Sequence, residues 1–421
     1  MKRADMRVPA LVLVVLGMIV VGCREAQDSQ QPRGAATSSM PAETQAPSLV
    51  VSTDTDLADA LEREIQRVVG ADEFSGVVLL SRHGQPLLRR AYGLADRERQ
   101  RPNAVDTPFA LASVSKMFTA VAVAQLAEQQ MVSFDATIGS LLPTYPTGPA
   151  SSQVAVHHLL TMSSGIPDLF RSPQFWAGVA EIRTLPEFWP YFANEPLDFQ
   201  PGTQWAYSNS NFLILGAIIE RTLERPFIST VEQQIFHPVG MTETGYLSSA
   251  FPNAARGYTR TRTSDEPGTD TGPNRWYPAW DDPAPESRTA GDDAGDCVAC
   301  VAMGGGFSTA DDLVRFADAL MQGRLLGQDM TRRVLTGHVP AHEYGGHDGY
   351  GFETRVVNGV RIVGHRGGFS GIANRVEFYP DLGYVLVVLG NSDATGAEAI
   401  ADQMRDLIAA SPALSVIGVD K

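Results

Sequence analysis

One serine and one lysine stand at a spacing that permits nucleophilic catalysis. Lysine occurs only at Lys2, Lys116 and Lys421, and arginine supplies the other permanently basic side chains. Lys116 follows Ser113 by three residues, so the two side chains would share one face of a helix. Arginine stays charged, whereas a desolvated lysine can lose its proton and act as a base. The pair therefore predicts a serine nucleophile that is activated by an amine.

The segment after Ser113 predicts a buried helix. From Val114 to Ala127 almost every side of a helix would be apolar, which is typical of a core helix. Ser113 would lie at its start, where unpaired N–H groups and the helix dipole favour a developing anion. The alternative is a helix cap followed by a surface lysine, but this helix offers Lys116 no polar face.

A tyrosine motif supplies a second acid–base group. Tyr207-Ser208-Asn209 stands before a predicted helix over 211–223. A cation near a phenol lowers the pKa of the phenol, so Tyr207 beside Lys116 can accept the Ser113 proton and later activate water. An aromatic residue packed before a helix cap is the structural alternative.

A glycine-rich motif follows a predicted strand near the end of the chain. It reads Gly364-His365-Arg366-Gly367-Gly368, and its glycines allow a substrate to approach the backbone closely. A turn with a bulge explains the same glycines.

These motifs, with segments 158–167 and 304–313, resemble the β-lactamase-related serine hydrolases. That family includes class C β-lactamases, D-Ala-D-Ala carboxypeptidases, D-aminopeptidases and esterases, and the resemblance covers about residues 55–409. It implies a DD-peptidase/β-lactamase-like fold and catalysis without a metal or organic cofactor. The motif Gly-x-Ser-x-Gly of α/β-hydrolases does not occur in the sequence.

The resemblance also assigns roles to single residues. It implies Ser113 as nucleophile, Lys116 as proton acceptor and Tyr207 as second base. Asn209 would bind substrate and orient Lys116. The backbone N–H groups of Ser113 and Gly368 would form the oxyanion hole, in which one donor typically contributes a factor of ~10²–10³ to kcat.

One motif departs from the β-lactamase pattern. Where β-lactamases usually have Lys-Thr-Gly, this chain has His365-Arg366-Gly367. Arg366 replaces a hydroxyl that commonly helps to bind a substrate carboxylate, and Arg366 either binds the carboxylate itself or points away. The departure argues against efficient β-lactam hydrolysis and leaves the substrate open.

Hydrophobic periodicity predicts an α+β fold. Helices are expected over 57–69 and 396–409, and strands over 75–81, 85–91, 351–357, 360–365, 372–379 and 384–389. An antiparallel sheet of about five strands would be built from both ends of a catalytic domain over 51–415. Residues 51–112 and 341–415 form its α/β part, and 113–340 form an inserted, mostly helical part. Within that part, Thr261–Asp296 predicts an acidic surface loop or lid.

The amino-terminal region has the features of an exported lipoprotein. A basic start and an apolar run over 8–21 predict a signal peptide over 1–22, too short for a membrane span. Cys23 ends this run in a lipobox-like context, so we expect lipidation there and a flexible tether over 23–50. An ordinary secretory signal is the alternative. The predicted location is the periplasm or cell exterior, on the outer membrane where one exists.

Charge and the remaining side chains exclude several functions. The formal net charge of −15 argues against a nucleic-acid partner. Cys297 and Cys300 predict a small disulfide in an exported protein, with two free thiols as the alternative. The segment from His342 to His347 has one residue too many for the metalloprotease motif, so a loop is expected and no metal site.

The sequence therefore predicts a lipid-anchored serine hydrolase that acts through a Ser113 acyl-enzyme. Its substrates would be small molecules or peptides with an ester, amide or β-lactam carbonyl, and cell-wall D-amino-acid peptides are among them. The alternative is a catalytically silent scaffold of the same fold that binds peptidoglycan or a protein partner.

Overall fold

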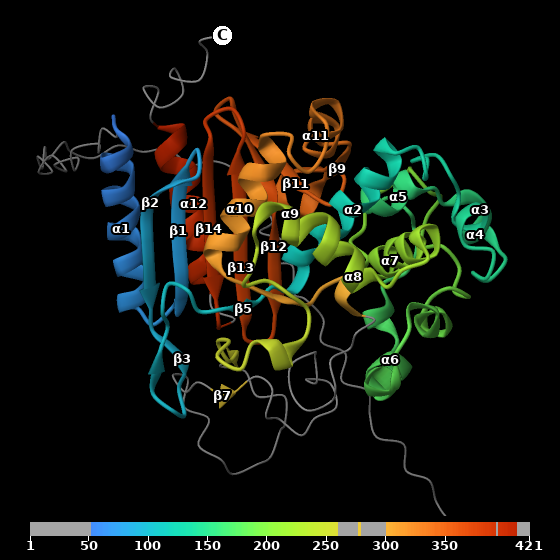
Figure 1. Cartoon of the computed structure of the whole chain (residues 1–421), viewed down its shortest axis with the longest axis horizontal. Helices are drawn as coiled ribbons and strands as arrows, with labels where there is room; N and C mark the ends of the chain where they lie inside the picture. Colours follow the sequence, from blue (N-terminus) through green and yellow to red (C-terminus); the bar gives the residue numbers. More distant parts are fainter. Residues whose placement is uncertain (1–51, 260–276, 279–299, 393–394, 411–421) are drawn as a thin grey trace, which may run out of the picture. The chain divides into compact units, whose positions relative to one another are not determined.

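The computed structural model describes residues 52–259, 277–278, 300–392 and 395–410 (Figure 1). The predicted signal peptide, Cys23, the tether, Cys297 and nearly all of Thr261–Asp296 lie outside these ranges. Cys300 begins a short helix, but its side chain is not described. Within the described ranges, no helix combines the length and the apolar character that crossing a bilayer requires.

An antiparallel sheet of eight strands forms the frame of the molecule (Figure 1). Its order is β2-β1-β14-β13-β12-β11-β10-β9, so the amino-terminal hairpin joins the carboxy-terminal strands through the pairing of β1 with β14. The strands are β1 (Gly76–Arg82), β2 (Gln85–Tyr92), β9 (Val339–Ala341), β10 (Gly346–Asp348), β11 (Glu353–Val357), β12 (Val360–Phe369), β13 (Ile372–Tyr379) and β14 (Tyr384–Gly390).

The predicted α+β class is confirmed, but the prediction of about five strands is wrong. The sheet gains β9, where no strand was predicted, and β10, which overlaps the end of the loop predicted over His342–His347. Each has only three residues, and β9 contains Pro340, so neither shows the alternation of apolar and polar residues that predicts a strand. Proline is tolerated there because β9 is the edge strand.

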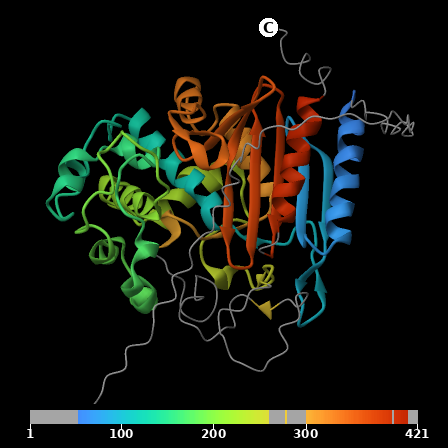
Figure 2. The ribbon, with the colours of Figure 1, turned by 180° about the vertical axis from the view of Figure 1, so that it is seen from behind.

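Alternate residues of the strands serve two separate cores. Val78 and Leu80 face α1 (Asp54–Gly70) and α12 (Gly396–Ala409), which cover the face seen in Figure 2. Val77 and Leu79 belong to a larger core on the opposite face, which includes α10 (Ala310–Met321) and the helical part. This follows from the two-residue period of a strand. The register of the sheet therefore decides on which face each side chain lies.

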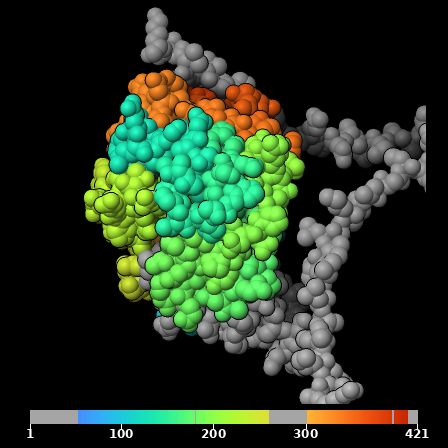
Figure 3. Space-filling model, turned by 90° about the vertical axis from the view of Figure 1, so that its right-hand side faces the viewer, coloured from blue at the N-terminus to red at the C-terminus, as the bar shows by residue number. Residues whose placement is uncertain are grey.

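Two buried helices, α2 (Lys116–Glu128) and α7 (Asn209–Leu223), form the centre of the helical part. Shorter helices surround them, and Figure 3 shows the surface that this part presents. They are α3 (Ile138–Leu141), α4 (Pro149–Gln153), α5 (Val156–Leu160), α6 (Pro173–Gly178), α8 (Phe227–Val231), α9 (His237–Val239) and α11 (Gln328–Val334).

Short 3₁₀ turns, one π-helical turn (η5) and two-stranded ribbons complete the described chain. The turns are η1 (Ala112–Ser115), η2 (Leu169–Arg171), η3 (Val179–Glu181), η4 (Leu185–Tyr191), η5 (Glu232–Phe236), η6 (Ser248–Ala250), η7 (Cys300–Ala302) and η8 (His342–Tyr344). The ribbons pair β3 (Leu94–Asp96) with β4 (Arg101–Pro102), β5 (Phe109–Ala110) with β8 (Phe307–Ser308), and β6 (Tyr258–Thr259) with β7 (Tyr277–Pro278).

Candidate active site

Ser113 is presented by a sharp turn between a strand and a helix. The chain leaves β5, passes Ala112 with φ +48°, and enters the 3₁₀ turn η1, from which α2 continues at Lys116. A positive φ is strained for alanine and persists only where neighbours hold it. Here the Ala112 carbonyl accepts hydrogen bonds from Ser115 Oγ (2.7 Å) and Gly305 N (3.4 Å). The turn leaves Ser113 partly exposed, whereas Lys116 is fully buried.

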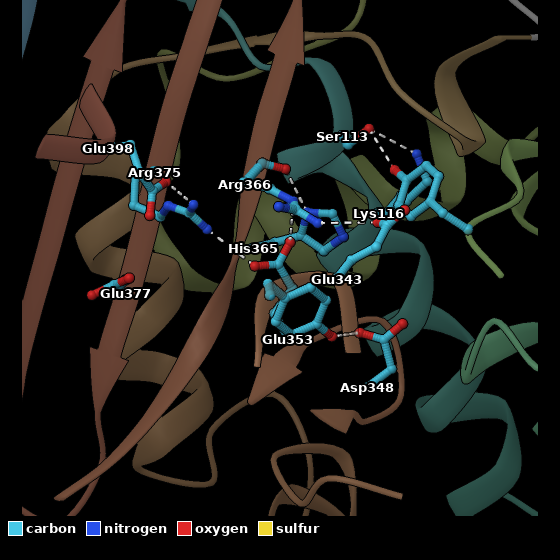
Figure 4. A network of polar contacts seen from close by, with 12 residues as sticks. Ser113, Lys116, Glu343, Asp348, Glu353, His365, Arg366, Arg375, Glu377 and Glu398 are labelled. Carbon is cyan, nitrogen blue, oxygen red and sulfur yellow. Dashed lines mark hydrogen bonds and ion pairs between the residues drawn. The ribbon is translucent and has the colours of Figure 1, made fainter. Parts of the chain in front are cut away.

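Lys116 contacts three oxygen atoms of different kinds. Its Nζ lies 2.9 Å from Ser113 Oγ and 2.8 Å from Asn209 Oδ1, and it also hydrogen-bonds the carbonyl of Met303. The oxygens of Asn209 and Met303 can only accept hydrogen bonds. A neutral amine has two N–H bonds and one lone pair. The two carbonyl oxygens therefore take both N–H groups, and the lone pair is left for the Ser113 hydroxyl, beside which Lys116 lies in Figure 4.

Burial allows Lys116 to be populated in its neutral form near neutral pH. Desolvation lowers the pKa of Lys116 to about 7, and the negative charge of Asp168 opposes part of that shift. The aromatic rings of Tyr207 and Phe212 lie 5.0 and 5.6 Å from Nζ, within cation–π range. The same pocket therefore tolerates the ammonium that forms when Lys116 takes a proton.

Tyr207 lies beside Lys116, also contacts the nucleophile and is a proton donor. Its hydroxyl donates to Ser113 Oγ over 2.8 Å. The sequence predicted a pKa lowered by Lys116, but the structure gives the opposite direction. Burial raises the pKa of Tyr207, and the charges of Asp168, Glu353 and Asp348 raise it further. Lys116 is therefore the group placed to act as base, and Tyr207 holds its proton.

Asp168 is a polar residue of the site that the sequence analysis missed. Its Oδ2 accepts hydrogen bonds from both Nδ2 and the backbone N of Asn209, each at 2.9 Å. These bonds fix the Asn209 amide with its oxygen toward Lys116. Asp168 follows directly after segment 158–167. This position beside a motif is the feature of the sequence that could have marked Asp168 as a residue of the site.

The motif at 365–368 divides between the two faces of β12. Because alternate residues face opposite sides, His365 and Gly367 lie toward the larger core, and Arg366 and Gly368 lie toward the α12 face. A Cβ at Gly367 would stand 2.2 Å from the Leu111 carbonyl oxygen, so only glycine allows β12 this close to the nucleophile turn. A Cβ at Gly368 would meet nothing within 4 Å. The oxyanion hole of Ser113 and Gly368 stays a prediction.

His365 is buried and neutral beside Lys116. Desolvation, against the opposing charge of Glu353 and with a smaller contribution from Lys116, lowers the pKa of His365 to about 4. Its Nδ1 lies 2.5 Å from the Arg366 carbonyl oxygen. That oxygen only accepts, so Nδ1 carries the ring hydrogen.

Arg366 points away from Ser113 into an ion-pair network (Figure 4). Its Nε lies 3.0 Å from Glu353, and its terminal nitrogen lies 3.8 Å from Glu343. Glu353 also pairs with Arg375 at 3.0 Å. Although burial raises it, the pKa of Glu353 stays below its usual value because His365 and these arginines are near. The sequence left open whether Arg366 binds a substrate carboxylate or points away. In the structure it points away from the nucleophile.

A second buried carboxylate supports the segment that carries Tyr207. Asp348 accepts hydrogen bonds from Trp205 Nε1 and Tyr344 Oη. Burial raises the pKa of Asp348 to about 7. Trp205 precedes Tyr207 by two residues, so Asp348 ties the tyrosine segment to the edge of the sheet. Nothing in the sequence marks Asp348 as part of the site.

His342 and His347 lie apart from this site, exposed in η8 and β10. Among the described residues, no group of three or more His, Cys, Asp or Glu side chains is arranged to hold a metal ion.

Comparison with known proteins shows which family the chain resembles. The β-lactamase family model matches residues 61–411. Esterase EstB of Burkholderia gladioli is 34% identical over 203 residues, which are 44% of this chain and 48% of EstB. The D-aminopeptidase of Brucella canis is 26% identical over 351 residues, which are 81% of this chain and 61% of that protein. The matched regions thus span less than two thirds of either relative.

A solved structure extends the similarity to the whole fold. A penicillin-binding protein from Bacillus halodurans superposes with a TM-score of 0.68 at 27% identity, covering 82% of this chain and 98% of that one. The family match covers most of the chain and includes Ser113, Lys116, Tyr207 and the motif at 365–368. The chain belongs to the β-lactamase family.

Proposed function

We propose that the protein is a serine hydrolase that cleaves uncharged carboxylic esters through a Ser113 acyl-enzyme. One observation carries the proposal: the buried Lys116 amine lies 2.9 Å from Ser113 Oγ, and its other two polar partners are carbonyl oxygens. This arrangement leaves the lone pair of the Lys116 amine free to accept the hydrogen of the Ser113 hydroxyl. The similarity to an esterase and a D-aminopeptidase supports the same reaction class.

Acylation begins with proton transfer. As Lys116 accepts the Ser113 proton, Oγ attacks the ester carbon, and the carbonyl oxygen becomes an oxyanion that the N–H groups of Ser113 and Gly368 are predicted to bind. The C–O bond then breaks. The leaving oxygen receives the proton from the Lys116 ammonium, directly or through Tyr207, and Lys116 is again neutral.

Deacylation uses the same base. Water attacks the acyl carbon and gives one proton to Lys116. As the bond between the acyl carbon and Ser113 Oγ breaks, Lys116 passes that proton to Oγ. The raised pKa of Tyr207 argues against a phenolate as the water-activating base. Tyr207 instead supplies a hydrogen bond to Oγ, which stabilises the serine oxygen as it leaves.

Arg366 explains why an uncharged substrate is favoured. Its guanidinium lies on the α12 face of β12 and pairs with Glu353, so it does not reach a carboxylate bound at Ser113. Carboxylate-bearing D-Ala-D-Ala peptides and β-lactams therefore lose the anchor that the Lys-Thr-Gly motif commonly provides. Neutral esters need no such anchor.

A substrate panel tests the proposal. We expect turnover of p-nitrophenyl butyrate, with kcat/KM well above that for nitrocefin or a D-Ala-D-Ala peptide. Ser113→Ala should abolish turnover and labelling by a fluorophosphonate. Arg366→Ala should change KM for nitrocefin by less than about threefold, because the side chain faces away. Preferred hydrolysis of the peptide, or a large rise in that KM, contradicts the substrate assignment. Absence of turnover and labelling favours a silent scaffold.

We further propose that the enzyme is exported and anchored through a lipid on Cys23. The basic start, the apolar run over 8–21 and the cysteine at its end support this. In a bacterial host the protein should sediment with membranes and yield a lipid-modified Cys23 peptide by mass spectrometry, and Cys23→Ser should remove the modification. A soluble wild-type protein without that modification would exclude the anchor.

A further inference from the structure

A cavity lies on the sheet away from the catalytic strand. It has a volume of about 400 Å³ and lies between the tip of the β1–β2 hairpin and α10, with Leu79, Val239 and Val314 among its apolar walls. Two strands, β14 and β13, separate β1 from the catalytic strand β12. At ~4.8 Å for each strand, the cavity is about 14 Å across the sheet from the motif at 365–368. Its volume is within the range of small-molecule sites, ~300–1,000 Å³.

Two buried polar groups line this cavity without a protein partner. Ser81 is completely buried, and its Oγ has no hydrogen-bond partner. Asp318 is 7% exposed, and within the part of the chain that the structure describes no hydrogen bond or ion pair reaches its carboxylate. Buried polar groups are normally paired, and leaving them unpaired is unfavourable. Both groups therefore suit an external ligand.

Three other charged side chains of the cavity, those of Asp311, Arg315 and Arg324, already have partners. Asp311 forms an ion pair with Arg89 at 2.6 Å, and Arg315 pairs with Asp312. Arg324 donates its Nε hydrogen to Gln322 over 3.2 Å. Arg324 and His83 act on Asp318 only as more distant positive charges, and burial raises the pKa of Asp318 in spite of them. Asp318 is thus the cavity's carboxylate without a direct counter-ion.

We propose that this cavity binds a primary ammonium group carried on a short apolar chain. The ammonium would donate to the Asp318 carboxylate and to Ser81 Oγ, and the carbon chain would contact Leu79, Val239 and Val314. An ammonium fits because it offers three donors to two acceptors. Among the described residues the cavity offers one unpaired carboxylate and one unpaired hydroxyl as ligands, too few for a metal site, and its apolar walls favour an organic cation. The site is independent of the Ser113 chemistry.

The test is calorimetric titration of the intact protein with n-butylammonium chloride, with 1-butanol and sodium chloride as matched probes. We expect the wild type to bind butylammonium, and Asp318→Asn to weaken binding at least about tenfold, as expected for the loss of a charge-assisted hydrogen bond. Asp318→Asn should fold well, because it removes an unpaired buried charge. Asp381→Asn is the charge-matched control, since Asp381 does not line the cavity and pairs with Arg361, and it should bind as the wild type does.

Three results overturn the site. Equal affinity of Asp318→Asn and wild type places the amine elsewhere. Equal binding of 1-butanol shows a purely apolar cavity, and no binding heat with no rise in Tm shows that the cavity takes no amine. A Ser81→Ala variant that weakens butylammonium binding, while its esterase rate stays unchanged, supports the proposal and separates this cavity from the catalytic site.

Discussion

Replacing Asp168 with asparagine tests how the site keeps the Lys116 lone pair free. In the wild type, two N–H groups of Asn209 bind Asp168 Oδ2 at 2.9 Å, so the Asn209 oxygen faces Lys116. If the amide turned over, its NH₂ would donate to the Lys116 lone pair and compete with the Ser113 hydroxyl. The turned amide would also set its oxygen against the Asp168 carboxylate. Asp168→Asn removes that repulsion because an asparagine can donate as well as accept.

The expected magnitude follows from the bonds that are lost. A hydrogen bond to a charged group contributes about 1.5–3 kcal/mol. Because 1.36 kcal/mol corresponds to a factor of ten in rate, loss of one such bond predicts a roughly 10- to 150-fold lower kcat/KM. The charge of Asp168 also raises the pKa of Lys116. Removing it should lower that pKa from about 7, so the acid limb of the kcat/KM profile moves to lower pH.

The assay is the pH dependence of p-nitrophenyl butyrate hydrolysis from pH 5 to 9. Asp198→Asn is the matched control, because Asp198 lies in the same part of the chain but pairs with Arg171 at 2.7 Å instead of Asn209. The control should keep both the rate and the pH profile. A loss of rate without movement of the acid limb would show that Asp168 acts only by supporting the fold.

A charge swap separates orientation from charge. In Asp168→Asn/Asn209→Asp, both oxygens at position 209 accept hydrogen bonds, so a turned side chain cannot block Lys116. The carboxylate beside Lys116 should raise the lysine pKa and move the acid limb to higher pH. Above that limb, the double variant should be faster than Asp168→Asn alone. If it is slower at every pH, the explanation by amide orientation is refuted.

Three further predictions concern the acid–base groups. Lys116→Met should lower kcat by ~10²–10⁴, the usual contribution of a general base, and stopped-flow assays should show a slower acylation burst; near-wild-type acylation would assign the base elsewhere. Tyr207→Phe should lower kcat but keep the acid limb near pH 7, since Lys116 and not a phenolate titrates there; disappearance of the limb would contradict this. Burial lowers the pKa of His157 and His338, so the unfolded chain takes up protons first and stability should decrease as pH falls below about 6.5. Urea unfolding at pH 7.5 and 5.5 measures this, and His338→Gln should reduce the difference, whereas the exposed His342→Gln should not.

Periodicity and motif spacing determined much of the architecture. The turn residues Pro380–Gly383 between the segments 372–379 and 384–389, and the Asn358-Gly359 turn before β12, predict the hairpins correctly, because each depends on residues close in sequence. The helix over 396–409 has the predicted ends. The pairing of Ser113 with Lys116 was also predictable, because one helical turn separates them. The strands β9 and β10 were not, since three residues are too few to show a period.

Tertiary structure alone decided what the catalytic groups can do. The sequence shows Lys116, Asn209 and Met303 far apart, and only packing of α2, α7 and η7 brings two carbonyl oxygens to the amine. The protonation of Tyr207 depended on burial, which raises its pKa, whereas the sequence suggested a neighbouring cation that would lower it. The direction of Arg366 followed from the register of β12 and its pairing with Glu353 across the sheet. Local pattern sets which groups are present, whereas desolvation and register set their charge and orientation.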